Sequence, residues 1–91
     1  MDKIALQKLV RKTLRSQRYV FGTNIKDQSK IYVDTWIGEL TDGITVYVVN
    51  SHNDYRPEQL SMYKSVAKAL IDDGYQISMC YPCHIRVTNK I

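Results

Sequence analysis

The chain of 91 residues is poor in the residue types that mark specialised folds. It has two cysteines, two prolines and two histidines, with one tryptophan and one phenylalanine beside seven tyrosines. Two cysteines do not suggest a disulfide framework, and they fit a reducing compartment. No run approaches the ~20 apolar residues that span a bilayer, so we expect no membrane segment. The charged N-terminus lacks the apolar run of a signal peptide, and we expect a cytoplasmic protein.

Acidic residues are scarce at the start of the chain. Residues 1–30 hold eight Lys and Arg against two Asp, a balance of +6, whereas residues 31–91 hold five against seven, a balance of −2. A basic arm on a near-neutral body indicates an acidic partner, of which nucleic acid is the commonest. The length and the 44% hydrophobic content fit one modest core, so we expect a single domain over residues 1–91.

Residues 2–18 are predicted to form a helix, because apolar residues recur there at spacings of three and four. Asp2 lies in the first turn, where the helix dipole favours a negative charge. The opposite side is uniformly basic, and no Glu occurs between residues 3 and 26. We interpret this side as a surface for phosphates, with an ordinary solvated helix face as the alternative. With the lysines of the following polar loop, the predicted contacts are Lys8, Arg11, Lys12, Arg15, Arg18, Lys26 and Lys30.

Residues 31–50 predict a β-hairpin around which the sheet is organised. Two β-prone runs flank Asp42-Gly43, a pair that tolerates the positive φ angles of a two-residue type I′ turn. With this turn, the residues that lie opposite each other are Thr41 and Ile44, Gly38 and Tyr47, Ile37 and Val48, and Trp36 and Val49.

The hairpin then has two unlike faces. The aliphatic face is expected to meet the core and carries Ile31, Val33, Thr35, Ile37, Ile44, Val46 and Val48. The second face is unusually aromatic and carries Tyr32, Asp34, Trp36, Leu40, Thr45, Tyr47 and Val49. Aromatic rings on an open sheet stack on bases, at ~1–3 kcal/mol each. We therefore predict that Tyr32, Trp36 and Tyr47 bind bases; the alternative is that the first strand, a loop or a dimer partner covers them.

The remaining segments complete an α+β fold. A short first strand is expected at Tyr19-Val20-Phe21, and a second helix over residues 56–73, capped by Asp54 and ended by Gly74. The face of this helix that we expect in the core comprises Leu60, Tyr63, Val66, Ala67, Leu70 and Ile71. Residues 75–88 alternate without a slip, which predicts one long strand, kinked or bulged at Pro82 and lying at a sheet edge.

These elements predict an antiparallel or mixed sheet of three or four strands, with both helices on one face. A long edge strand is a natural site for a second chain to pair, so we expect a homodimer through the C-terminal strand.

The segment Cys80-Tyr81-Pro82-Cys83-His84 has the spacing of a haem-attachment motif, a redox dithiol or half of a zinc site. Haem needs an enclosing helical fold, and a redox dithiol needs a helix start, and neither is expected here. Zinc would require four converging ligands, namely Cys80, Cys83, His84 and His52. A single strand places the two cysteines on opposite faces unless Pro82 breaks the strand, in which case zinc remains the alternative. We therefore expect no metal and no cofactor.

Two histidines also allow an enzyme to be considered. In a metal-independent ribonuclease, His52 and His84 would act as base and acid while Arg56 contacts the phosphate. The polar loop that holds His52 and Arg56 is equally explained by the capping of the following helix. We therefore expect no enzymatic activity, and keep the ribonuclease as an alternative.

The order helix, strand, hairpin, helix is similar to that of the double-stranded RNA-binding domain when Tyr19–Phe21 is a strand. Without that strand, the order is similar to an RNA-recognition fold that lacks its opening strand. Both similarities are of topology and imply RNA as the ligand. The sequence thus predicts a small non-enzymatic RNA-binding protein. The alternative is a protein-binding module or an inhibitor of a larger enzyme, such as an accessory protein of a phage or mobile element.

Overall fold

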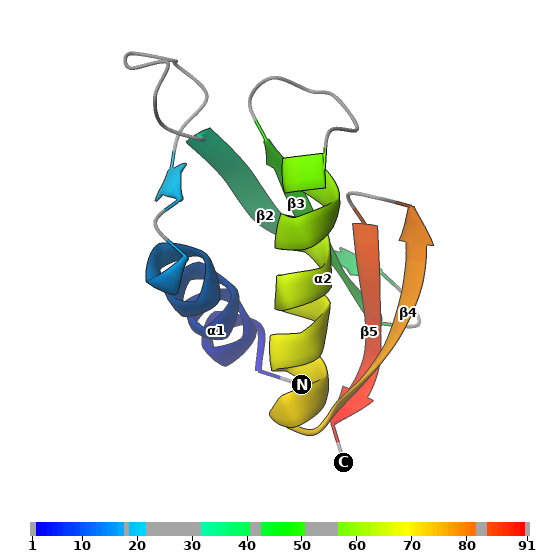
Figure 1. The fold of residues 1–91 in the computed structure, drawn as a ribbon. Helices are drawn as coiled ribbons and strands as arrows, with labels where there is room; N and C mark the ends of the chain where they lie inside the picture. The colour runs from blue at the N-terminus through cyan, green and yellow to red at the C-terminus, as the bar shows by residue number, and fades with distance from the viewer. Residues whose placement is uncertain are drawn as a thin grey trace.

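The structure, a computed structural model, describes residues 2–17, 19–21, 32–40, 43–50, 57–81 and 84–90. Within these ranges the elements are α1 (Lys3–Ser16), β1 (Val20–Phe21), β2 (Tyr32–Leu40), β3 (Gly43–Asn50), α2 (Pro57–Asp72), β4 (Tyr75–Tyr81) and β5 (His84–Lys90). The sheet order is β1-β2-β3-β5-β4; β1 runs parallel to β2 and the other neighbours are antiparallel. Both helices cover one face of this sheet (Figure 1). The predicted α+β class is confirmed, and the short first strand exists.

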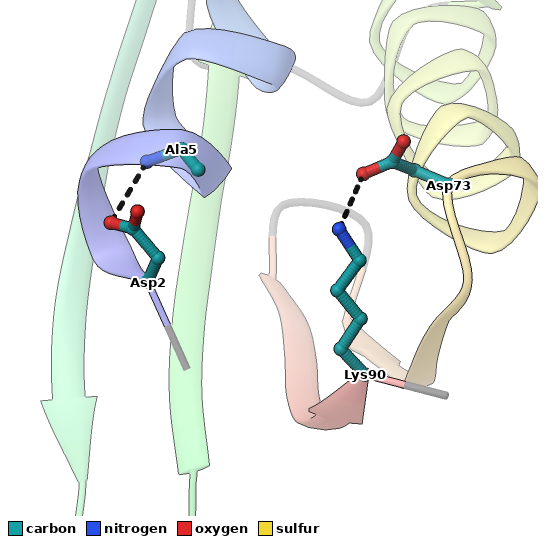
Figure 2. A network of polar contacts seen from close by, with 4 residues as sticks. All are labelled: Asp2, Ala5, Asp73 and Lys90. Atoms are coloured by element: carbon teal, nitrogen blue, oxygen red, sulfur yellow. Dashed lines mark hydrogen bonds and ion pairs between the residues drawn. The ribbon is translucent and has the colours of Figure 1, made fainter.

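Helix α1 begins where its sequence provides a cap. The side chain of Asp2 accepts hydrogen bonds from the backbone N–H groups of Ile4, at 2.9 Å, and Ala5, at 3.2 Å, the second of which is drawn in Figure 2. Both donors would otherwise lack a partner in the first turn. The helix ends at Ser16, two residues before the predicted end, and buries a stripe at spacing four that comprises Leu6, Val10 and Leu14.

Helix α2 ends as predicted and buries four of the six residues expected in the core. Gly74 has a φ of 93°, and its N–H donates to the carbonyl of Ile71 at 3.0 Å. Leu60 and Ile71, which were expected in the core, are 45% and 56% exposed, so that part of the predicted face is wrong. Tyr63, Val66, Ala67 and Leu70 are buried as predicted, and Gln59 and Met62 complete the buried face.

A polar residue is tolerated on that face because its side chain has a partner inside the core. The Nε2 of Gln59 donates to the carbonyl of Val48 in β3 at 2.9 Å. A hydrophobicity pattern misses such a position, since it treats glutamine as solvated.

The central hairpin has the predicted faces but a different register. Leu40 pairs with Gly43, Ile37 with Val46 and Trp36 with Tyr47, so each residue meets a partner two places from the predicted one. A shift of two residues leaves every side chain on its face, whereas a shift of one would turn them all over. Among the residues expected in the core, Val33, Thr35, Ile44, Val46 and Val48 are buried and Ile37 is partly buried.

Gly43 explains the register. It belongs to β3 and not to the turn, and a Cβ at this position would lie 2.6 Å from the carbonyl oxygen of Val87 in β5. Glycine is therefore required by the close approach of β5. Thr41 and Asp42, which connect the two strands, and Ile31 lie outside the described residues.

The predicted long strand over residues 75–88 is wrong: the chain reverses and forms a hairpin of β4 and β5. Tyr81, at the end of β4, pairs with His84, at the start of β5, so that an odd-numbered residue lies opposite an even-numbered one. A register irregularity between Met79 and Tyr81 then pairs Met79 with Ile85 and Ile77 with Val87. Ile77 in β4 therefore lies beside Val87 in β5 on the core side, and the alternation continues on both arms of the hairpin.

One buried cluster joins both helices to the sheet. It comprises Leu6, Val10, Leu14, Val33, Ile44, Val46, Val48, Met62, Tyr63, Val66, Ala67, Leu70, Tyr75, Ile85 and Val87. These side chains come from α1, α2 and strands β2 to β5, so the core lies between the helical layer and one face of the sheet. The other face of the sheet carries the side chains that alternate with these core residues along each strand.

Candidate nucleic-acid interface

The basic side of α1 is exposed as predicted. The cations on it in the described residues are Lys8, Arg11, Lys12 and Arg15, and all four are exposed. No acidic residue occurs within α1, and none of these four makes an ion pair with a carboxylate in the described part of the chain. Three further predicted contacts, Arg18, Lys26 and Lys30, lie outside the described residues.

Two of these arginines share one aromatic ring. The Cζ atoms of Arg11 and Arg15 lie 5.7 Å and 5.2 Å from the ring centroid of Phe21 in β1. Guanidinium groups at this distance are attracted to the ring face. Phe21 itself pairs with Val33 of β2 and packs against the core. The sequence shows the spacing of four between the arginines, but it does not show that the chain returns to bring Phe21 under them.

Three aromatic side chains form a row across the adjacent strands β2, β3 and β5. Trp36 stacks on Tyr47 with ring centroids 4.5 Å apart and planes inclined by 12°. The ring of His84 meets Tyr47 edge-on, with centroids 4.2 Å apart. We call Trp36, Tyr47 and His84 the aromatic row. Trp36 is 45% exposed, and the other two are partly buried.

The aromatic row differs from the set predicted. His84 was considered only as an acid or a metal ligand, because its neighbour Tyr47 becomes visible only once β5 is known to pair with β3. Tyr32 is 7% exposed and therefore offers little ring surface for stacking. The row is also tied to the helical layer, since the hydroxyl of Tyr63 donates to the carbonyl of His84 at 2.6 Å.

The basic side of α1 and the aromatic row belong to opposite sides of the sheet. Tyr47 lies between the buried Val46 and Val48, which face the core that α1 also contacts. By strand alternation, the ring of Tyr47 and its stacked partner Trp36 point away from the helices. Among the described residues, the structure therefore does not bring the predicted phosphate contacts of α1 and the aromatic row onto one surface.

The predicted catalytic and metal alternatives fall largely outside the described residues. His52, Arg56 and Cys83 lie there, and the side chain of Cys80 is not described either. Among the described residues, no three of His, Cys, Asp and Glu come together in a way that could hold a metal ion. The two cysteines do not lie on one strand, because β4 ends at Tyr81 and β5 begins at His84. They are therefore not held on opposite faces of a single strand, as was predicted.

The predicted dimerisation edge is β4, which pairs only with β5 in the described sheet. Its pairing is irregular at two places, between Gln76 and Ile77 and between Met79 and Tyr81. Such irregularities are common at sheet edges, where they discourage further pairing. Met79, 49% exposed, is the largest apolar surface described on this strand. Homodimerisation through β4 stays a prediction.

No protein-family model matches this chain, and neither a curated protein nor a solved structure matches it. In the described residues, no helix is long and apolar enough to cross a membrane.

Proposed function

We propose that this protein is a small, non-enzymatic nucleic-acid-binding protein of the cytoplasm, with RNA as its ligand, and that α1 contacts the phosphates. The observation that carries the proposal is the exposed side of α1 with Lys8, Arg11, Lys12 and Arg15. A solvated helix with this many cations would usually interleave Glu at spacing four, and α1 contains no acidic residue. Phosphates would supply the missing negative charge.

Binding of this kind is driven by the release of counterions, so it depends steeply on salt. Each phosphate contact contributes about −0.7 to −0.9 to the slope of log affinity against log salt concentration. The four described cations would therefore give a slope of about −3 to −4. A ligand held by apolar contacts would show a far smaller dependence.

The aromatic row would provide a second contact for a single strand. Trp36 presents a half-exposed ring on which a base could stack. Because this ring and α1 lie on opposite sides of the sheet, a ligand that touches both must pass round a sheet edge. A flexible single strand can do so, whereas a stiff duplex cannot. The arrangement thus favours single-stranded RNA over a duplex.

Charge reversal on α1 tests the proposal directly. The double variant Arg11→Glu with Arg15→Glu is expected to reduce the affinity for a mixed-sequence single-stranded RNA by at least tenfold at low salt, and to flatten the salt slope. Fluorescence anisotropy measures both quantities. The matched control is Lys64→Glu with Lys68→Glu, which makes the same change of charge at the same spacing on α2, where both lysines are exposed. If the two double variants bind alike, α1 is not the phosphate contact.

A second candidate function is favoured by the position of Trp36 on the side away from the cations. Trp and Tyr dominate the energetics of protein interfaces, and the half-exposed Trp36 stacked on Tyr47 is a pair of this type. The protein would then be a binding module or an inhibitor of a larger enzyme, as expected of an accessory protein of a phage or mobile element. Trp36→Ala would abolish capture of such a partner at any salt concentration. Nucleic acid that co-purifies and is removed by salt would instead favour the first function.

A further inference from the structure

We propose that Phe21 is a positioning residue that holds Arg11 and Arg15 as a paired guanidinium site for backbone phosphates, and that this site requires arginine and not merely positive charge. The inference rests on the proposed function, because it assigns the recognition chemistry of the same helix. It concerns three residues, Arg11, Arg15 and Phe21, which we call the arginine pair and its ring.

The geometry separates these two cations from the others on the helix. Both guanidinium carbons lie within 6 Å of one ring centroid, at 5.7 Å and 5.2 Å, although both side chains are exposed. Lys8 and Lys12 have the same spacing of four, but neither is placed over a ring in the described part of the chain. The arginine pair is therefore held in place, while the lysines are ordinary solvated cations.

The ring of Phe21 is held by the sheet and the core. Phe21 pairs with Val33 in the parallel β1–β2 ladder and packs against the buried cluster. Its position therefore does not depend on the arginines. A side chain that rests on a fixed ring has already lost part of the rotational freedom that binding would otherwise remove, which strengthens binding without adding a contact.

The chemistry of the guanidinium group explains why lysine would not substitute. A planar guanidinium can lie against a ring and still present N–H groups along its edges, which match the geometry of phosphate oxygens. An ammonium group is a compact and strongly hydrated charge without this planar fork. Replacing arginine by lysine therefore keeps the charge, and with it the counterion release, but loses the planar packing of the guanidinium on the ring and the paired donors.

The experiment separates charge from geometry. We expect Arg11→Lys with Arg15→Lys to weaken binding to short single-stranded RNA by roughly tenfold, from the loss of two ring-stacked guanidinium forks and their paired donors, with the salt slope unchanged. The control Lys8→Gln with Lys12→Gln removes two charges, and the slope of log affinity against log salt concentration should become less steep by about 1.5. If the arginine-to-lysine variant binds as tightly as the native protein, the inference is wrong.

Phe21 is tested by the same measurement. Phe21→Leu should weaken binding to a similar extent, whereas Phe21→Tyr keeps a ring and should bind as the native protein does. In the arginine-to-lysine background, Phe21→Leu should have a much smaller effect, since the planar contact that positions the paired donors is already gone. A full additional loss there would overturn the inference. Phe21→Tyr and the lysine variant decide the matter even if Phe21→Leu does not fold.

The outcomes also distinguish this inference from the proposed function. If charge reversal at Arg11 and Arg15 has no more effect than the control on α2, nucleic-acid binding by α1 is excluded. The role of Phe21 is then excluded as well. If charge reversal abolishes binding while the lysine variant is unaffected, the proposed function stands and only the role of Phe21 is removed.

Discussion

The ring of Trp36 lies almost parallel to the ring of Tyr47, with centroids 4.5 Å apart and planes inclined by 12°. The two residues are direct partners in the β2–β3 ladder, and Tyr47 is in turn the direct partner of His84 in β5. Cross-strand pairs of this kind are a main source of stability in a sheet. The aromatic row is therefore part of the fold as well as a surface, and its loss should be measurable in the absence of any ligand.

The first prediction concerns the centre of this row. Tyr47→Leu removes two ring contacts and should lower the free energy of unfolding by about 1–3 kcal/mol, while Trp36→Leu removes one and should cost about half of that. Urea denaturation followed by circular dichroism measures both. Met79→Ala serves as a control, since Met79 is 49% exposed on β4, and it should change stability by less than about 0.5 kcal/mol. An effect of Tyr47→Leu no larger than this control would show that the row is not structural.

The second prediction uses Trp36 as a reporter, since it is the only tryptophan in the chain. Under the proposed function, a single-stranded RNA that stacks on the row should quench the emission of Trp36. A ligand that contacts only α1 should leave the emission unchanged, because the ring lies on the other side of the sheet. Titration of the protein with RNA while emission is recorded distinguishes the two. The charge reversal at Arg11 and Arg15 should abolish the quenching if both surfaces bind one strand.

The class of fold and most of the core could be predicted from periodicity. Apolar spacing located both helices, and alternation placed Val33, Val46 and Val48 on the core face although the register was shifted by two. Alternation along a strand shows which face each residue lies on, but it does not change when the strand is shifted by two residues. The predicted faces of the hairpin were therefore right, whereas the predicted cross-strand partners were wrong. The alternation of apolar residues also concealed the reversal of the chain between Tyr81 and His84. The register irregularity near Met79 keeps the alternation in phase on both strands of this hairpin.

The contacts between distant segments could not be predicted in this way. The pairing of β3 with β5 creates the contact between Tyr47 and His84, and the position of β1 places Phe21 under Arg11 and Arg15. Each depends on how the strands are ordered, for which the sequence carries no local signal. The separation of the basic side of α1 from the aromatic row follows from the same packing. The two sets of residues were chosen by chemical type alone, and their relative placement needed the structure.

The third prediction concerns Gly43. A Cβ there would lie 2.6 Å from the carbonyl oxygen of Val87, and the φ of 154° is one that other residues rarely adopt. Gly43→Ala should therefore lower the free energy of unfolding by about 1–3 kcal/mol, through a clash with the backbone of β5. Gly38→Ala is the matched control, because its Cβ would meet only the ring of Tyr47, at 4.0 Å. Thermal unfolding of both variants should show a large shift for the first and a small one for the second; equal shifts would contradict the register.

The fourth prediction concerns the N-terminal cap of α1. Asp2→Ala removes the acceptor for the N–H groups of Ile4 and Ala5, and should cost about 0.5–2 kcal/mol. Asp2→Ser keeps a capping oxygen and should retain most of the stability. Chemical denaturation measures the difference between the two variants. If they are equally destabilised, the charge of Asp2 rather than its hydrogen bonds stabilises the helix.

The fifth prediction is a pH dependence at the C-terminal end of α2. Nζ of Lys90 donates to the carboxylate of Asp73 at 3.2 Å (Figure 2), and this hydrogen bond, followed by the negative charge of Asp73, raises the pKa of Lys90 above its ordinary value of 10.5. Because the folded state holds this proton more tightly than the unfolded state, the stabilisation is complete below pH 10.5. It is lost as the pH rises through the higher pKa of the folded state.

Asp73→Asn should therefore lower the pKa of Lys90 and remove this part of the alkaline pH dependence. The pKa can be measured by an NMR titration of the Lys90 side chain. The matched control is Asp72→Asn, because Asp72 accepts from Lys68 at 2.7 Å and raises the pKa of that lysine in the same manner. Each substitution should lower the pKa of its own partner and leave the other lysine unchanged. If Lys90 titrates identically in native protein and Asp73→Asn, the ion pair does not form in solution, and the strand β5 is not tied to the end of α2 by this contact.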